Sequence, residues 1–274
     1  MALLDMLVQK PGTDLIVAHF NHGIRSDSKK DEELVEQTAE KLHLAFEVGY
    51  GNLGSAASEE QAREARYDFL NKVKKKHHAS AIITAHHQDD LLETAILNII
   101  RGSGRRGLSA IAENPDIKRP LLHWDKEDIM AYAKKHDLHW REDPTNTDEK
   151  YLRNYIRHSL MPKFSQKERQ KLLSELNKIT LGNRVINQEI ANLSQNLAKD
   201  RAINRADFTN LPNEVANEVL MHFLRQNDVR DFNRKTIERL VVVVKTAKPK
   251  TTHDVEKGTQ LKMTSTQALL TTTD

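Results

Sequence analysis

The sequence predicts an α/β domain with a parallel sheet flanked by helices, followed by a smaller, mainly helical domain. Two observations lead to this fold class. Up to about residue 150, short apolar runs alternate with stretches of helical period, a pattern typical of the strand–helix units of parallel sheets. Beyond that point, long polar segments carry apolar residues at helical spacing. The length of 274 residues also exceeds that of a typical single domain, so two domains are expected.

The first domain is expected at residues 1–155, a helical domain at 156–250, and a tail or the start of a further domain at 251–274. The boundary region contains Met161-Pro162, and proline disfavours continuation of a helix. The last segment is rich in threonine and has no helical stripe, so we expect one or two strands there, or no regular structure.

Four short, mostly apolar runs are the predicted strands of the first domain. Their length and composition fit strands that a parallel sheet buries on both faces. They cover residues 15–18, 45–48, 81–84 and 119–122.

Helix signals lie between and after these runs. Ser58-Glu-Glu-Gln61 has the capping-box pattern and predicts a helix that continues to about Lys76. A similar start at Ser28 precedes an apolar stripe that extends to Leu42. Further helices are predicted at about 88–101, 126–136, 213–226 and 233–245, with helical apolar spacing also over 172–193.

The composition excludes several classes of protein. Hydrophobic residues make up 38% and charged residues 30%, as in a globular domain. No run approaches the ~18 apolar residues of a membrane span, so no membrane partner is expected. The N-terminal residues show no basic region or cleavage site of a signal peptide, and there is no cysteine for disulfides or thiolate zinc sites. We therefore expect a cytoplasmic protein.

Charge is distributed unevenly along the chain. Residues 151–210 carry eleven Lys and Arg and five Asp and Glu, a local excess of +6 against a total of +3. This excess indicates a segment that holds RNA or DNA while chemistry happens elsewhere. A solvated helical face explains the same excess equally well.

The densest group of reactive side chains is Thr84-Ala-His-His-Gln-Asp-Asp-Leu-Leu-Glu-Thr94. On a helix, its apolar residues form a buried stripe at i, i+3, i+4 and i+7, namely Leu92, Ala95, Ile96 and Ile99. His86, Asp90 and Glu93 then lie on a different face near the helix N-terminus. Carboxylates in a first turn also stabilise the helix dipole, which is the structural alternative.

Metal binding is a second interpretation of this stretch. Four of its side chains are potential ligands: His86, His87, Asp89 and Asp90. No spacing diagnostic of a zinc site occurs, so no metal site is predicted.

Arginines and glycines follow in Arg101-Gly-Ser-Gly-Arg-Arg-Gly107. Glycine allows close approach of the backbone, and the side chains of Arg101, Arg105 and Arg106 suit bidentate contacts with phosphate. A glycine C-cap of the preceding helix is the structural alternative.

Polar residues also follow the first predicted strand, in His19-Phe-Asn-His22-Gly-Ile-Arg25. In open parallel sheets, ligands bind at the carboxyl ends of the strands. His19, Asn21, His22 and Arg25 therefore suggest a rim that contacts a base or a phosphate, and His86 ends another strand at the same edge.

A third polar block is Trp140–Arg157, which contains the turn sequence Asp143-Pro-Thr-Asn146. Arg153 and Arg157 lie one helical turn apart and could follow a phosphate backbone. A capped, solvated helix is the alternative.

Taken in order, these blocks resemble the bacterial tRNA(Ile)-lysidine synthase family of PP-loop ATP pyrophosphatases. The resemblance is strong over about residues 1–165 and looser over 166–245. The matching segments are 18–25, 58–67 (with Arg63 and Arg66), 84–94, 101–108, 119–122 and 140–157. It implies an adenine nucleotide alpha hydrolase-like fold.

The resemblance implies an ATP-dependent ligase. Such enzymes adenylate C2 of the wobble cytidine 34 of tRNA(Ile), which has a CAU anticodon, and release pyrophosphate. The ε-amine of free L-lysine then attacks C2 and AMP leaves. ATP with Mg²⁺ would be the cofactors, and a homodimer is one arrangement considered.

The implied roles fall on matching residues. Asp90 and Glu93 would hold the lysine ammonium, while Arg101 and Arg105 would offset charge on the phosphates. The nucleotide would contact His19, Asn21, His22, Arg25 and His86. The tRNA would contact Arg63, Arg66, Arg106, Arg153 and Arg157.

One departure from the family pattern is the absence of Ser-Gly-Gly-x-Asp-Ser, the loop that wraps the ATP phosphates. Met1–Leu7 resembles the helix that follows that loop, so we expect weak ATP binding and no ligase activity from the chain as written. The alternatives are a non-catalytic tRNA-binding fragment, a metal-dependent phosphoesterase and a sulfur-inserting relative. The last relies on cysteines that this chain lacks.

Overall fold

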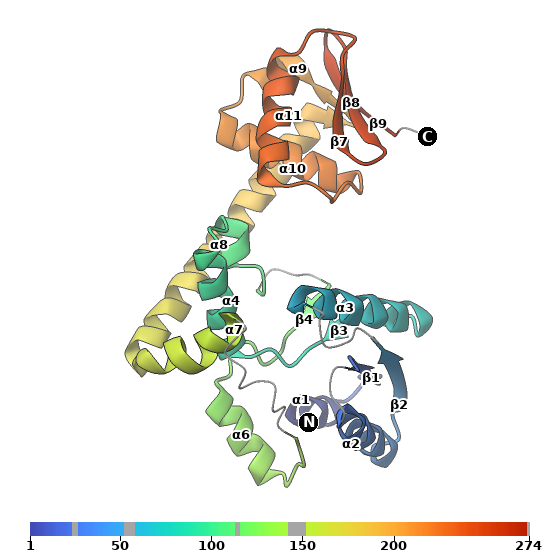
Figure 1. Ribbon diagram of the computed structural model, residues 1–274, viewed down its shortest axis with the longest axis vertical. Helices are drawn as coiled ribbons and strands as arrows, with labels where there is room; N and C mark the ends of the chain where they lie inside the picture. Colours follow the sequence, from blue (N-terminus) through green and yellow to red (C-terminus); the bar gives the residue numbers. More distant parts are fainter. Residues whose placement is uncertain (24–26, 52–57, 113–115, 142–151, 273–274) are drawn as a thin grey trace. The chain divides into compact units, whose positions relative to one another are not determined.

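The computed structural model describes residues 1–23, 27–51, 58–112, 116–141 and 152–272 (Figure 1). The chain forms two compact units, Met1–Thr180 and Leu181–Asp274. The division between them falls within the long helix α8 (Gln166–Leu197), whereas a boundary near residue 155 was expected from the sequence. Because α8 starts in the first unit and ends in the second, the helical periodicity continues across the junction and does not mark it.

Parallel strand pairs form the β structure of the first unit. β1 (Ile16–Asn21) pairs with β2 (Ala45–Tyr50), and β3 (Ile82–Ile83) pairs with β4 (Ile117–Lys118). The first pair is in register from Ile16 and Ala45 to Asn21 and Tyr50. Parallel pairing and the intervening helices agree with the predicted α/β class. Within the described residues, however, the two pairs are separate two-stranded sheets.

The strand predicted at residues 119–122 is wrong. β4 ends at Lys118, and a turn follows in which the Leu122 N–H donates to the carbonyl oxygen of Arg119 at 3.1 Å. Pro120 has no N–H to offer a strand ladder. Leu121 and Leu122 are nevertheless buried, so their apolar character reflects packing of a turn.

Most helices of the first unit begin and end close to the predicted residues. The capping box of Ser58 and Gln61 is present, with the hydroxyl of Ser58 accepting from the Gln61 N–H at 3.2 Å. The helices are α1 (Ala2–Val8), α2 (Ser28–Lys41), α3 (Glu59–Lys76), α4 (Gln88–Ile100), α5 (Arg105–Leu108), α6 (Lys126–Lys135) and α7 (Leu152–Tyr155). A π-helical turn (Ile156–Leu160) and a 3₁₀ turn (Met161–Lys163) lead toward α8.

α4 contributes the centre of the first unit's core. Leu92, Ala95 and Ile96 are buried as predicted and pack with Ile156, Met161 and Leu176. The prediction is wrong for Ile99, the fourth member of the stripe, because this residue is 55% exposed. Glu93, which was expected on the polar face, is buried instead.

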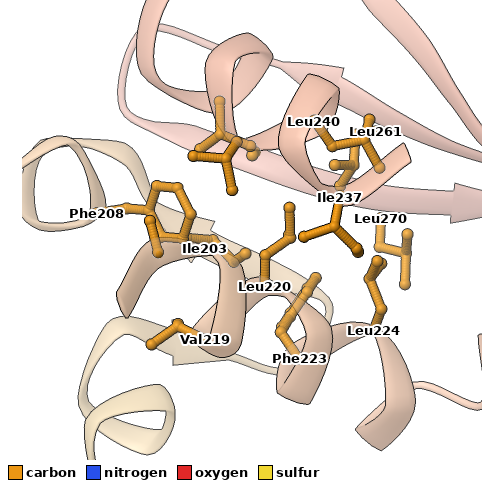
Figure 2. Close-up of a cluster of buried hydrophobic side chains, with 14 of the residues drawn as sticks. Ile203, Phe208, Val219, Leu220, Phe223, Leu224, Ile237, Leu240, Leu261 and Leu270 are labelled. Carbon is orange, nitrogen blue, oxygen red and sulfur yellow. The ribbon is translucent and has the colours of Figure 1, made fainter. Parts of the chain in front are cut away.

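The second unit packs three helices against an antiparallel sheet. α9 (Arg205–Thr209), α10 (Asn213–Gln226) and α11 (Arg234–Thr246) cover a sheet of strand order β5-β6-β9-β8-β7. Figure 2 shows Leu220, Phe223 and Ile237 meeting Leu261 and Leu270 in its core. The strands are β5 (Ala198–Lys199), β6 (Ala202–Asn204), β7 (Thr252–Glu256), β8 (Thr259–Met263) and β9 (Gln267–Thr272).

The expectation of one or two strands, or no regular structure, after residue 251 is therefore an underestimate, because three strands form there. No helix in the described parts of either unit has the length and apolar character needed to span a membrane.

Candidate functional site

The candidate site is built around the N-terminus of α4, where β3 leads into the helix. His87 is the N-cap, and its Nδ1 accepts from the Asp89 N–H at 3.3 Å. Asp90 closes the capping box by accepting from the His87 N–H at 3.0 Å. The first-turn carboxylates thus have the structural role that the sequence analysis considered, and they also bring negative charge to the positive end of the helix dipole.

Glu93, one turn further along α4, binds two arginines. Its Oε1 accepts from Arg157 Nε at 2.6 Å, and its Oε2 accepts from Arg157 Nη2 at 2.8 Å and Arg153 Nε at 3.2 Å. The Glu93 side chain is only 1% exposed. The bond to Glu93 raises the pKa of Arg157 above its ordinary value. This fork of charge-assisted bonds fixes both guanidinium groups.

Asp90 lies beside the same two arginines at longer distances. Its Oδ1 is 3.5 Å from Arg157 Nη2 and 3.9 Å from Arg153 Nη2. These are ion-pair distances without a short hydrogen bond. The structure thus brings together four residues that the sequence analysis assigned to two different ligands.

Further arginines surround His86. Burial is the main cause that lowers the pKa of His86 to about 4, and the positive charges of Arg119, Arg66 and Arg63 act in the same direction against Asp90. His86 is therefore neutral near pH 7, and its Nδ1 is 2.8 Å from the hydroxyl of Thr84. A neutral imidazole among guanidinium groups can exchange a proton or a hydrogen bond with a bound anion.

α3 supplies two of these arginines and an aromatic ring that holds them. The guanidinium carbons of Arg63 and Arg66 lie 4.8 and 5.4 Å from the ring centre of Tyr67. Burial lowers the pKa of Arg66, and the positive charges of Arg63 and Arg153 lower it further. The cationic cluster, defined as Arg63, Arg66, Arg119, Arg153 and Arg157, therefore connects α3, the end of β4 and the segment from α7 onward.

The polar residues at the carboxyl end of β1 form a separate group, and His19 and Asn21 lie within the strand, which continues past its predicted end at Ala18. Asn21 Nδ2 donates to Glu32 Oε2 at 2.9 Å and its Oδ1 accepts from the Gly23 N–H at 3.0 Å. His22 stacks edge-on against Phe20, with ring centres 4.9 Å apart. Burial lowers the pKa of His19, opposed by the carboxylates of Glu32 and Asp31. Arg25, predicted for the same rim, lies outside the described residues.

The arginine loop, residues 101–107, begins with a glycine C-cap of α4, which was the structural alternative to phosphate binding. Gly102 has φ +66° and follows the C-cap Arg101, while the Ser103 N–H donates to Asn98 O at 2.8 Å. This is a Schellman end of α4, and it requires the left-handed conformation that glycine adopts without strain. Arg105 and Arg106 start α5, and Arg101 is exposed.

Three residues of this region were missed by the sequence analysis: Tyr67, Arg119 and Arg169. Arg119 follows β4 at the carboxyl end of β3, and its Nη1 donates to Ile111 O at 2.7 Å. Arg169, on α8, lies 3.8 Å from Asp89. Two features of the sequence could have indicated these residues. Tyr67 lies one helical turn after Arg63, and Arg119 directly follows β4, the strand that pairs with β3.

No group of three or more His, Asp or Glu side chains converges as metal ligands within the described parts of the chain. His86 and His87 illustrate the reason, because one faces Thr84 and the other caps α4.

Comparisons with known proteins agree on one family. Residues 1–164 match the PP-loop domain. The tRNA(Ile)-lysidine synthase of Thermotoga maritima is 39% identical over 155 residues, which are 54% of this chain and 37% of the relative. That of Geobacter sulfurreducens is 39% identical over 175 residues, 59% of this chain and 37% of the relative. The bifunctional protein TilS/HprT of Listeria monocytogenes is 29% identical over 280 residues, 93% of this chain and 43% of the relative.

This chain thus spans about 37–43% of the length of these curated relatives. Among solved structures, the U34-tRNA thiolase NcsA of Methanococcus maripaludis with its 4Fe-4S cluster aligns at a TM-score of 0.42 and 15% identity. That alignment covers 85% of this chain and 69% of the thiolase.

Proposed function

Because the chain belongs to the PP-loop domain family, we propose that it carries catalytic machinery of a tRNA(Ile)-lysidine synthase, with an adenine nucleotide alpha hydrolase-like fold. In the proposed reaction, cytidine 34 of tRNA(Ile), in its CAU anticodon, is adenylated at C2 by ATP, and pyrophosphate leaves. The ε-amine of free L-lysine then attacks C2. A carbon–nitrogen bond forms, AMP leaves, and the amine loses a proton.

The observation that carries this proposal is the cationic cluster at the N-terminus of α4. Five guanidinium groups and a helix N-terminus form a strong site for anions, and both ATP and RNA are anionic. Within the described part of the site, Asp90 and Glu93 offset part of this charge through their ion pairs with Arg153 and Arg157. Five cations against these two carboxylates give an excess of positive charge that favours phosphate groups.

The proposed roles follow the sequence analysis. His19, Asn21, His22, Arg25 and His86 contact the nucleotide, and Arg101 and Arg105 offset charge on its phosphates. The RNA backbone contacts Arg63, Arg66, Arg106, Arg153 and Arg157. Mg²⁺ would be held mainly by the phosphate oxygens of ATP, which is its usual mode of binding beside one or two carboxylates.

Asp90 and Glu93 were expected to hold the lysine ammonium. The pairing of Glu93 supports a different task, namely holding Arg153 and Arg157 in place for an anion. We therefore propose Glu93 as a positioning residue. The ammonium contact of Asp90 stays a prediction, and an unchanged apparent affinity for lysine in the Asp90→Asn variant would contradict it.

Incorporation of radiolabelled L-lysine into a tRNA(Ile) transcript, with ATP and Mg²⁺, tests the function of the full chain. From the chain as written we expect little incorporation, because it has no Ser-Gly-Gly-x-Asp-Ser loop; with that loop supplied before Met1 we expect incorporation into the C34 transcript and none into a C34→U transcript. Arg66→Ala should lower the rate at least 10-fold, whereas Arg230→Ala, a change at an exposed arginine of the second unit, should not. Equal labelling of both transcripts, or an unchanged Arg66→Ala variant, would contradict the proposal.

A non-catalytic tRNA-binding role is the second candidate, because residues 151–210 carry a charge excess of +6 that could hold RNA without ATP. Salt-dependent binding of the transcript without lysine incorporation would favour it. We also propose a cytoplasmic location and a homodimer. Cell fractionation tests the location, and light scattering on the purified chain tests the dimer.

A further inference from the structure

The cationic cluster divides into a paired half and an unpaired half. Arg153 and Arg157 form the paired half, because both donate to the buried carboxylate of Glu93, at 3.2 Å and at 2.6 and 2.8 Å. The unpaired half consists of three arginines: Arg63, Arg66 and Arg119. Within the part of the chain that the structure describes, none of the three forms an ion pair with a carboxylate. Their like charges repel one another, so an anion bound among them would stabilise this half.

Tyr67 lies among these three arginines. The guanidinium carbons of Arg63 and Arg66 lie 4.8 and 5.4 Å from the centre of its ring. Burial lowers the pKa of Arg119, and the neighbouring Tyr67 opposes that shift, so the phenol lies close to this third guanidinium group as well. Burial and the charges of the same three arginines lower the pKa of His86 to about 4, so they also lie near the start of α4. We call four residues the tyrosine subsite: Arg63, Arg66, Tyr67 and Arg119.

Two buried donor groups of the tyrosine subsite have no hydrogen-bond partner, namely the hydroxyl of Tyr67 and the Nε of Arg119. Arg119 Nη1 donates to Ile111 O at 2.7 Å, so the guanidinium group is held in place while its Nε stays unsatisfied. Arginines only donate hydrogen bonds and offer the Tyr67 O–H no acceptor. Buried polar groups are nearly always satisfied, so these two require a physical explanation. A group that satisfies both is an acceptor, and beside three cations an anionic acceptor binds most strongly.

We propose that the tyrosine subsite binds a phosphate oxyanion and that the Tyr67 O–H donates to one of its oxygens. This inference rests on the proposed function, in which both the phosphates of ATP and the RNA backbone reach the cationic cluster. The three guanidinium groups supply the charge, and the phenol adds a donor that carries none. Arg63 is the exposed member of the subsite, so a rotation of its flexible side chain admits the anion from solvent.

Calorimetric titration of the full chain with inorganic pyrophosphate and with a tRNA(Ile) transcript tests the subsite, and the two probes distinguish nucleotide phosphates from backbone phosphates. Tyr67→Phe keeps the ring and removes the hydroxyl. We expect it to weaken the binding of at least one probe ~10-fold, as the loss of one hydrogen bond to a charged group implies. The matched control is Tyr132→Phe, which removes a hydroxyl that donates to Asp5 at 2.7 Å and should leave the affinity for both probes unchanged.

Hydrogen exchange of the α3 amides shows whether Tyr67→Phe alters the helix itself, and we expect the rates of the parent. Arg66→Gln is a second variant that keeps the phenol and removes one charge. It should weaken the same probe ~10-fold and reduce the salt dependence of transcript binding if the transcript is that probe. An unchanged affinity of the Arg66→Gln variant for both probes would refute the inference.

The remaining outcomes separate this inference from the proposed function. The subsite is refuted if Tyr67→Phe binds both probes like the parent, even where Tyr67→Ala binds them more weakly, because the ring alone then explains Tyr67. It is also refuted if neither probe binds the parent. If Tyr67→Phe weakens a probe but lysine is never incorporated into tRNA, the subsite stands and the ligase proposal fails. If lysine is incorporated and Tyr67→Phe binds like the parent, the ligase proposal stands and the subsite fails.

Discussion

Replacing Glu93 with glutamine should destabilise the first unit substantially. The change removes the charge that three bonds of 2.6, 2.8 and 3.2 Å share, and it directs an amide N–H₂ toward guanidinium donors. Removing one partner of a buried ion pair costs ~3–5 kcal/mol. Arg153 and Arg157 are 19% and 31% exposed and can recover some hydration, so we expect the lower end, ~3 kcal/mol.

Because the two units need not unfold together, a local probe is required. Hydrogen exchange of the α4 amides in native buffer reports the opening free energy of the first unit. Glu64→Gln on α3 is the matched control, since Glu64 is exposed. A double-mutant cycle with Arg157→Gln should give a coupling of ~1–3 kcal/mol. A loss below ~1 kcal/mol for Glu93→Gln would show that the buried fork contributes little and would refute the reasoning.

Three further changes probe other features. Folding lowers the pKa of His86 from 6.5 to about 4, so its contribution to stability is present above pH 6.5 and lost as the pH falls toward 4. His86→Gln should therefore reduce the pH dependence of the unfolding free energy in that window. Gly49→Ala would place a Cβ 2.4 Å from Phe69 Cδ2 and should cost ~1–3 kcal/mol in urea unfolding, partly recovered by adding Phe69→Leu. Arg205 donates to three carbonyl oxygens at 2.6, 2.7 and 2.9 Å. Arg205→Lys should therefore lower the opening free energy of α11, measured by hydrogen exchange, by ~1–3 kcal/mol. Arg201→Lys, which loses one bond, should lower it less.

Local signals predicted the elements whose causes are local. The capping box at Ser58 and the helical stripe of Leu92, Ala95 and Ile96 each depend on residues within a few positions, and both are confirmed. For residues 251–274 the expectation was one or two strands, or no regular structure, although Thr259, Leu261 and Met263 of β8 alternate with more exposed residues. That two-residue period was present in the sequence, and threonine content was given more weight than alternation.

The site could be predicted only in part, because its decisive pairs are distant in sequence. Spacing placed Glu93 on the face of His86 and Asp90, but the partners of Glu93 are 60 and 64 residues away. Local spacing also gives no sign that Asp89 lies beside Arg169 while Asp90 lies beside Arg153 and Arg157. These neighbours come from later segments of the chain, so they depend on the tertiary structure.

Helix α8 has residues in the apolar clusters of both units. At ~1.5 Å per residue its 32 residues extend ~48 Å. Leu176 belongs to the first core, and Ile190 and Leu197 to the second, while no described residue from 181 to 189 belongs to either apolar cluster. Gly182 in this middle stretch lowers helix propensity by ~1 kcal/mol relative to alanine. The central turns should therefore open first, and a ligand that stabilises the first unit should slow hydrogen exchange in residues 166–180 of α8 and leave the rate in residues 190–197 unchanged.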